Sequence, residues 1–124
     1  MDDRILSVAQ RFQKANNDND AALMAEVCDP AMVVWHNYDR LETVGEANTK
    51  SLGWMHKTVK GIEWVTKSLL TTPEGFVWRH NVTGEAPGGL LNIESCIVAT
   101  VDSNMRITRI EEYLDPAQAA VLRG

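Results

Sequence analysis

The second half of the chain alternates long segments that favour β-strands with short segments that favour turns. Four strands are expected, over residues 62–70, 75–84, 90–101 and 105–113. The connections contain Gly, Pro, Asn or Asp, and each is short enough to join antiparallel neighbours. This pattern predicts an antiparallel meander of four strands.

The first half of the chain carries helical patterns instead. Three amphipathic helices are expected, and their apolar faces carry Ile5, Val8 and Phe12, then Leu23 and Val27, then Leu52, Met55 and Val59. Pro30 ends the second helix, because proline does not continue a helix. Two strands, residues 32–38 and 41–44, precede the third helix, and a last helical turn is expected within residues 115–122.

Helices followed by a meander of long strands indicate an α+β fold. We expect three helices to pack on one face of a strongly curved antiparallel sheet, which then encloses a cone-shaped pocket. The length of 124 residues suits one hydrophobic core, so a single domain over residues 1–124 is expected.

Charge and hydropathy exclude several classes of function. The net charge is -5 and the Lys and Arg residues are scattered, so the chain does not resemble a nucleic-acid binder. No segment approaches the roughly 20 apolar residues needed to span a bilayer, and we expect a cytoplasmic protein without membrane contact. Cys28 and Cys96 lack metal-ligand spacing, so free thiols and no metal site are expected.

Residues 33–39 form an unusually polar strand. Four consecutive side chains there can donate, accept or transfer protons: His36, Asn37, Tyr38 and Asp39. Such side chains need partners if they face inward, and a polar-lined cavity would supply them. The segment is therefore the first place to look for a functional site.

Strand alternation separates these side chains into two faces. His36 and Tyr38 share one face, whereas Trp35 and Asn37 share the other. If the first face lines the cavity, His36 is the candidate general base and Tyr38 is a proton donor or ligand anchor. If the second face does, Asn37 orients a carbonyl or hydroxyl group beneath Trp35.

His80 shares a strand face with Phe76, Trp78 and Val82, and this apolar set predicts that its side chain points inward. One interpretation is a structural histidine that a backbone carbonyl or a hydroxyl satisfies. The other is a catalytic pair with His36 or Asp39 across the pocket. Trp78 and Trp35 are candidate aromatic walls for a ring compound. His56, in a lysine-rich segment, is expected at the surface.

The order of these elements, the motif Trp-His-Asn-Tyr-Asp at 35–39 and the segments 75–80 and 105–115 resemble a known group. It is the SnoaL-like, ketosteroid-isomerase-like group of the nuclear-transport-factor-2 fold, and the resemblance covers nearly the whole chain. It implies a conical pocket for a small, largely apolar cyclic or aromatic molecule. It also implies acid–base chemistry without metal or cofactor, and a homodimer formed through the sheet.

The same resemblance implies roles for individual residues. The base of the steroid isomerases is an Asp on the first long strand, and counting back from Gly45 puts His36 near that position, with Asp39 three residues further on. The chain therefore departs from the isomerase pattern, although an imidazole remains suited to proton transfer at neutral pH. The isomerase Tyr of the first helix has no counterpart, because Phe12 stands there.

Glu94 is the residue that the resemblance aligns with the protonated acid of the isomerases. If Glu94 faces the pocket, apolar surroundings would raise its pKa and keep it neutral as a donor. If it faces outward, it is a solvated strand residue; alternation alone leaves both open. On the last strand the resemblance implies that Glu111 and Tyr113 contact a ligand, whereas Arg109 fits an exposed sheet or dimer face with Arg–Glu pairs better.

Two functions follow from this reading. The first is cofactor-independent acid–base catalysis of the isomerase, dehydratase, cyclase or epoxide hydrolase type. Its candidate catalytic residues are His36, Asp39 and His80, and its candidate ligand contacts are Tyr38, Asn37, Trp35, Trp78, Glu94, Glu111 and Tyr113. The second is a ligand-binding or dimerisation module without chemistry. Binding of a partner protein, as in nuclear transport factors, finds no separate support in the sequence.

Overall fold

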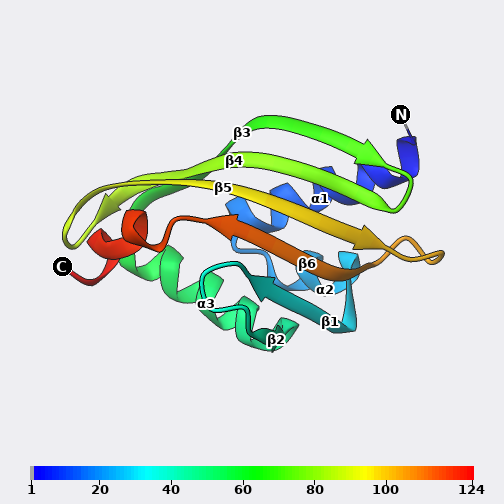
Figure 1. The fold of residues 1–124 in the computed structure, drawn as a ribbon. Helices are drawn as coiled ribbons and strands as arrows, with labels where there is room; N and C mark the ends of the chain where they lie inside the picture. Colours follow the sequence, from blue (N-terminus) through cyan, green and yellow to red (C-terminus); the bar gives the residue numbers. More distant parts are fainter. Residues whose placement is uncertain (1) are drawn as a thin grey trace.

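Six strands form one curved sheet, and helices cover its concave face (Figure 1). The computed structural model describes residues 2–124. The elements in chain order are α1 (Asp3–Asp18), α2 (Ala21–Val27), β1 (Cys28–His36), β2 (Glu42–Val44), α3 (Gly45–Thr58), β3 (Lys60–Thr72), β4 (Gly75–Ala86), β5 (Gly89–Val101), β6 (Ile107–Leu114) and the 3-10 helix η1 (Pro116–Arg123). This arrangement confirms the predicted α+β class.

The sheet has the strand order β2-β1-β6-β5-β4-β3. β3 to β6 form the predicted antiparallel meander, joined by short turns. β1, however, pairs with β6 in parallel, so the sheet is not antiparallel throughout. The difference has a simple cause, because no tight turn joins β1 to β6 and their relative direction is set by the packing of the whole chain.

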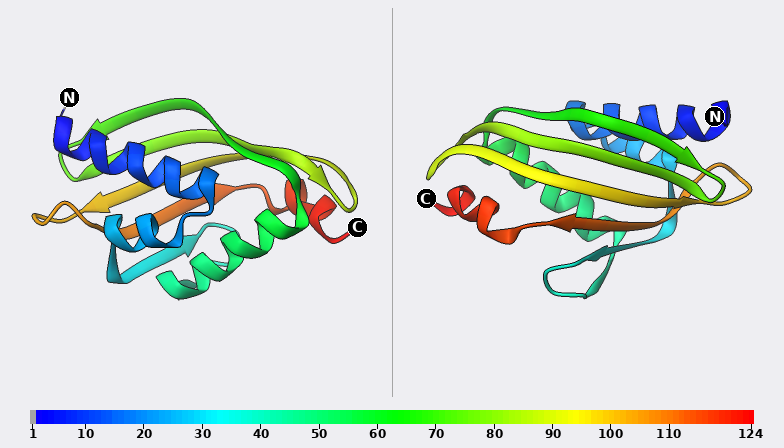
Figure 2. Two further views of the ribbon diagram at one scale, coloured as in Figure 1. Left: turned by 180° about the vertical axis from the view of Figure 1, so that it is seen from behind. Right: turned by 45° about the horizontal axis from the view of Figure 1, so that its top comes forward.

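Two aspartates fix the starts of the first two helices. Asp2 accepts hydrogen bonds from the backbone nitrogens of Arg4 and Ile5, and Asp20 accepts one from that of Leu23. These side chains satisfy amide groups that the first turn of a helix leaves free. Figure 2 shows α1 and α3 lying across the same face of the sheet. Within residues 2–124, no helix combines the length and apolar character that crossing a membrane requires.

The core lies between α1 and the middle of the sheet. Phe12 of α1 packs against Phe76 and, edge to face, against Trp78 of β4, with ring centroids 6.1 and 5.8 Å apart. All three side chains are buried almost completely. Aromatic pairs of this kind stabilise a core beyond the area that they bury, so they hold α1 at a fixed place above the sheet.

Two local expectations differ from the structure. α2 ends at Val27, and Pro30 lies within β1, where the register with β6 shifts between Cys28 and Val33. Proline fits there because an irregular stretch has no regular ladder bond for it to break. His56 is half-buried rather than at the surface, since its ring stacks on Trp64. Cys28 and Cys96 are free, as expected, and burial raises the pKa of the Cys28 thiol to about 12.

Candidate functional site

A cavity of about 750 Å³ lies between the concave face of the sheet and the helices. Its walls are mainly apolar, and they include Leu52 and Met55 of α3, Ile93 and Ile97 of β5 and Ile110 of β6. η1 contributes further apolar side chains at one end. The size and the character of the walls are those of a site for a small apolar molecule.

One polar pair stands among these walls. His36 on β1 and Glu112 on β6 are register partners, both line the cavity, and His36 Nε2 lies 2.9 Å from Glu112 Oε1. Ser95 of β5 donates its hydroxyl to the other carboxylate oxygen, Oε2, over 2.8 Å. Each side chain of the pair is only 19% exposed, so water screens their interaction weakly.

The pair shifts the pKa of both partners. The hydrogen bond that His36 donates to Glu112 raises the pKa of His36 above its usual value, and the charges of Glu112 and Asp39 add to this, although burial acts in the opposite direction. Burial would raise the pKa of Glu112, but the hydrogen bonds from His36 and Ser95 outweigh it and lower that pKa. Glu112 is therefore an anion at neutral pH, and His36 Nε2–H donates to it while Nδ1 makes no hydrogen bond within residues 2–124.

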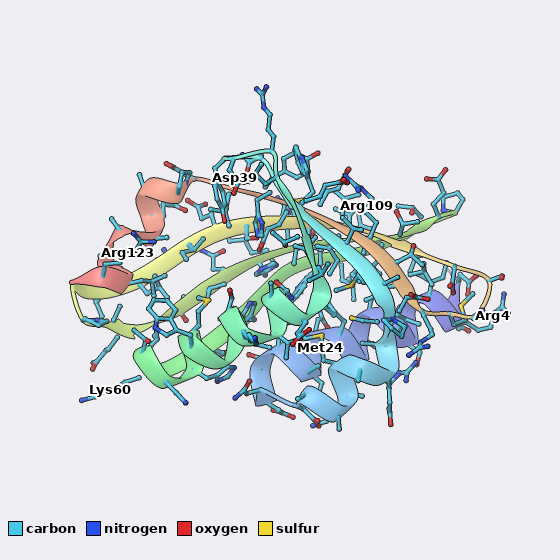
Figure 3. All side chains as sticks on the ribbon, turned by 90° about the horizontal axis from the view of Figure 1, so that it is seen from below. Arg4, Met24, Asp39, Lys60, Arg109 and Arg123 are labelled. Carbon is cyan, nitrogen blue, oxygen red and sulfur yellow. The ribbon has the colours of Figure 1, made fainter. Side chains whose placement is uncertain are left out.

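Tyr38 and Asp39 line the cavity on the same side as His36. The ring of Tyr38 lies 5.0 Å from that of His36, and burial together with nearby negative charge raises the pKa of its phenol. Tyr38 therefore remains a hydrogen-bond donor at neutral pH. Asp39 lies in the loop between β1 and β2 (Figure 3), where its carboxylate accepts from the backbone nitrogen of Leu41.

His80 points inward, as expected, but it does not line the cavity. Its ring stacks on Trp78 at 4.0 Å, and Nδ1 donates to the Trp78 carbonyl over 3.3 Å. Burial lowers the pKa of His80, so it is neutral. The expected pairing with His36 or Asp39 is absent among the described residues. Instead, His80 is the register partner of Ser95, which bonds Glu112.

Four candidate ligand contacts lie on the other face of the sheet. Trp35 packs against Tyr113 with ring centroids 5.4 Å apart, and Asn37 Oδ1 accepts from the backbone nitrogen of Leu114. Glu111 pairs with Arg109, which Figure 3 shows on the side away from the helices. The face of the first strand that lines the cavity is therefore the one that carries His36 and Tyr38. Arg109 lies on the outer face in Arg–Glu pairs, as expected.

Glu94 and Trp78 also lie outside the cavity. The Glu94 side chain is 62% exposed and contacts Gln118 and Lys67. Glu94 is therefore an outward-facing, solvated strand residue and not a donor in the pocket. Trp78 is fully buried in the core, where its indole nitrogen donates to the Thr66 hydroxyl.

Sequence reasoning missed Glu112 and Ser95, although a signal for both exists. Ile110 and Leu114 flank Glu112 at two residues' distance, and Ile93 and Ile97 flank Ser95 in the same way. Since side chains two residues apart in a strand share a face, the apolar neighbours indicate that Glu112 and Ser95 face inward. Within the described residues, no group of three or more His, Cys, Asp or Glu side chains is arranged to hold a metal ion.

The comparisons with known proteins concern the fold. No family model and no curated protein matches the chain. Many solved structures do. PrhC from Penicillium brasilianum has 8% identity and a TM-score of 0.83, and the match covers 97% of this chain and 85% of that chain. A proposed SnoaL-like polyketide cyclase from Shewanella denitrificans has 16% identity and a TM-score of 0.75, with 96% of each chain covered. IdmH, a proposed polyketide cyclase from Streptomyces antibioticus, has 13% identity and a TM-score of 0.80, with 94% of this chain and 99% of that chain covered. Identity this low carries the fold alone. The chain therefore has the fold of these proteins, the α+β architecture of SnoaL-like structures.

Proposed function

We propose that the protein binds a small, largely apolar cyclic or aromatic molecule in the cavity and moves a proton at His36. The observation that carries this proposal is the hydrogen-bonded pair of His36 and Glu112 in a mainly apolar cavity. A carboxylate that accepts from one imidazole nitrogen fixes the tautomer and makes the other nitrogen more basic. Such a pair is equipped for acid–base catalysis without a cofactor.

The proposed step follows from this geometry. His36 Nδ1 takes a proton from an acidic C–H or O–H bond of the ligand, whose bonding electrons stay on the ligand as an enolate or phenolate. Glu112 stabilises the imidazolium that forms, and Tyr38, which stays protonated, donates to the developing anionic oxygen. Return of the proton to another atom of the ligand gives an isomerisation. Attack of the carbanion on a carbonyl carbon of the same ligand, whose oxygen takes the proton from His36, gives a cyclisation. Loss of a β-hydroxyl group, which leaves as water with the proton from His36, gives a dehydration.

The comparisons agree with this class of reaction. Two of the proteins that share the fold are named as proposed polyketide cyclases, and a cyclisation of that kind also starts with removal of a proton from carbon. The alternative is a binding module that holds the same kind of molecule without chemistry. The two differ in whether a bound acidic group gives up its proton.

A naphthol probe tests this difference. 2-Naphthol is a small aromatic alcohol, and its anion absorbs and fluoresces at longer wavelength than the neutral form. We expect binding to wild type to lower the pKa of the bound hydroxyl, because His36 and Glu112 accept its proton. His36→Gln and Glu112→Gln should bind the neutral form only, and Glu111→Gln, on the opposite face, is the matched control.

Each result has a clear reading. Binding without any change in the naphthol pKa would favour the binding module. Absence of binding to the folded wild type would contradict an aromatic ligand site in this cavity. A lowered pKa that survives both His36→Gln and Glu112→Gln would assign proton transfer to another group.

A further inference from the structure

Asn16 places a second polar group deep in the cavity, away from His36. It lies in the last turns of α1, lines the cavity and is only 8% exposed. The other side-chain amide of the lining, Asn48 on α3, is more exposed. A buried amide in a mainly apolar wall is costly unless its polar atoms find partners.

The orientation of the Asn16 amide is fixed by its surroundings. Its Nδ2 donates to the backbone carbonyl of Phe12 over 2.9 Å, and a carbonyl oxygen can only accept. The atom that remains for the cavity is therefore the oxygen, Oδ1. No donor within residues 2–124 reaches it. The cavity thus presents an acceptor that a ligand must satisfy or leave unpaired.

The backbone around Asn16 is held in place by two further contacts. His56 Nε2 donates to the Asn16 carbonyl over 2.7 Å, and the His56 ring stacks on Trp64. Asn17 accepts from the Trp64 backbone nitrogen over 2.8 Å and donates to the Trp64 carbonyl over 3.3 Å. These contacts tie the end of α1 to α3 and β3, so the acceptor is preorganised before a ligand arrives.

Asn16 and His36 come from opposite sides of the cavity. His36 lies on β1, second from one edge of the sheet. The Asn16 carbonyl accepts from His56 of α3, and its neighbour Asn17 bonds to Trp64 of β3, the strand at the other edge. α3 spans the distance between these sides, starting after β2 and ending beside Trp64. From Asn48 to His56 this helix rises about 12 Å, which sets the scale of a ligand that reaches both ends.

We infer that the ligand is an elongated apolar ring compound that carries a hydrogen-bond donor, a hydroxyl or N–H group, at the end opposite its reacting group, and that Asn16 Oδ1 accepts from this donor. The inference rests on the proposed function only in taking this cavity as the ligand site. Asn16 thus binds the ligand at one end and touches no reacting atom.

Matched probes test the donor directly. 2,6-Dihydroxynaphthalene and 6-methoxy-2-naphthol fill nearly the same space, but only the first has a donor at both ends; 4,4′-dihydroxybiphenyl and 4′-methoxybiphenyl-4-ol form a longer pair. Dissociation constants are measured by calorimetry. In the probe pair whose length matches the cavity, wild type should bind the dihydroxy compound about 5- to 10-fold more tightly than its methoxy partner, which is the usual contribution of one hydrogen bond. Equal affinities in both pairs would overturn the inference.

Variants assign the preference to Asn16. Asn16→Leu keeps the volume but removes the acceptor, so the preference should disappear. Asn48→Leu makes the same change elsewhere in the cavity and should retain the preference. A preference that survives Asn16→Leu, or that Asn48→Leu removes, would overturn the inference.

Two measurements keep this test separate from the proposed function and from folding. The preference should persist in Glu112→Gln, where the naphthol hydroxyl is no longer ionised, so failure of proton transfer and failure of the Asn16 contact give different results. In wild type, nuclear magnetic resonance should show the Asn16 side-chain amide shifting with the dihydroxy probe and much less with its methoxy partner. Equal shifts would count against the contact even if no Asn16 variant folds.

Discussion

His36 and Glu112 are direct neighbours across two parallel strands, although 76 positions separate them in sequence, and their side chains meet at 2.9 Å. The parallel pairing of β1 with β6 creates this contact, because it brings the inward face of each strand into register. Ser95 on the next strand adds a third member through the second oxygen of Glu112. The candidate site therefore depends on three strands that meet only in the folded sheet.

Glu112→Gln should lower the pKa of His36, since the hydrogen bond and the negative charge that raise it are lost. Nuclear magnetic resonance titration of the His36 ring measures this change. Glu111→Gln removes the same charge from the opposite face and should alter the His36 pKa far less. Equal shifts in the two variants would mean that the general charge of the strand, and not the contact, sets this pKa.

The pair should stabilise the protein in a defined pH window. The raised His36 pKa stabilises the fold below the ordinary value of 6.5, and this is lost as pH rises through the folded pKa. The lowered Glu112 pKa stabilises it above the ordinary value of 4.5, and this is lost as pH falls. The difference in unfolding free energy between wild type and His36→Gln should thus be larger at about pH 5.5 than at about pH 9, measured by urea denaturation.

His80 should have the opposite effect. Burial lowers its pKa, so the unfolded chain binds a proton that the folded protein does not, and stability is lost as pH falls below the ordinary value of 6.5. His80→Phe removes this titration while keeping a ring beside Trp78. Urea denaturation across this range should show a flatter acid limb for the variant. An unchanged limb would mean that His80 is not the group responsible.

Trp78→Ala should cost about 3–5 kcal/mol of unfolding free energy, the usual cost of removing a large buried aromatic side chain. Trp78 is fully buried and packs on Phe12 and His80. Trp35→Ala, on the outer face, removes the same side chain from a half-buried position and should cost clearly less. Urea denaturation of both variants checks the order, and similar losses would contradict the assignment of the core.

We propose a homodimer formed through the outer face of the sheet, where Trp35, Val98 and Tyr113 leave apolar surface partly exposed. Val98→Lys should then shift the protein toward monomer in sedimentation velocity, because a buried unpaired charge opposes association. Leu41→Lys, at an exposed loop position, is the matched control and should leave the distribution unchanged. A monomeric wild type at all concentrations would refute the dimer.

Prediction from the sequence succeeded where the signal is local. The turns between 70 and 107 fixed the antiparallel meander, and the apolar neighbours of His80 placed it inward. It failed where two strands far apart in sequence had to be brought together. The resemblance points to the face of Glu111 and Tyr113, whereas the structure has Glu112 in the cavity lining. Ile110 and Leu114, each two residues from Glu112, are the apolar neighbours that indicate its face.

The sequence by itself determined the class of fold and an unusually polar strand around His36, because periodicity and turn chemistry act over a few residues. Only the tertiary structure decided that His36 meets Glu112, that His80 is buried outside the cavity lining and that Asn16 lines the cavity on the side away from His36. Those outcomes depend on strand register and on helix packing, which arise from contacts across the whole chain. Side-chain chemistry was readable from the sequence, whereas the partners of each side chain were not.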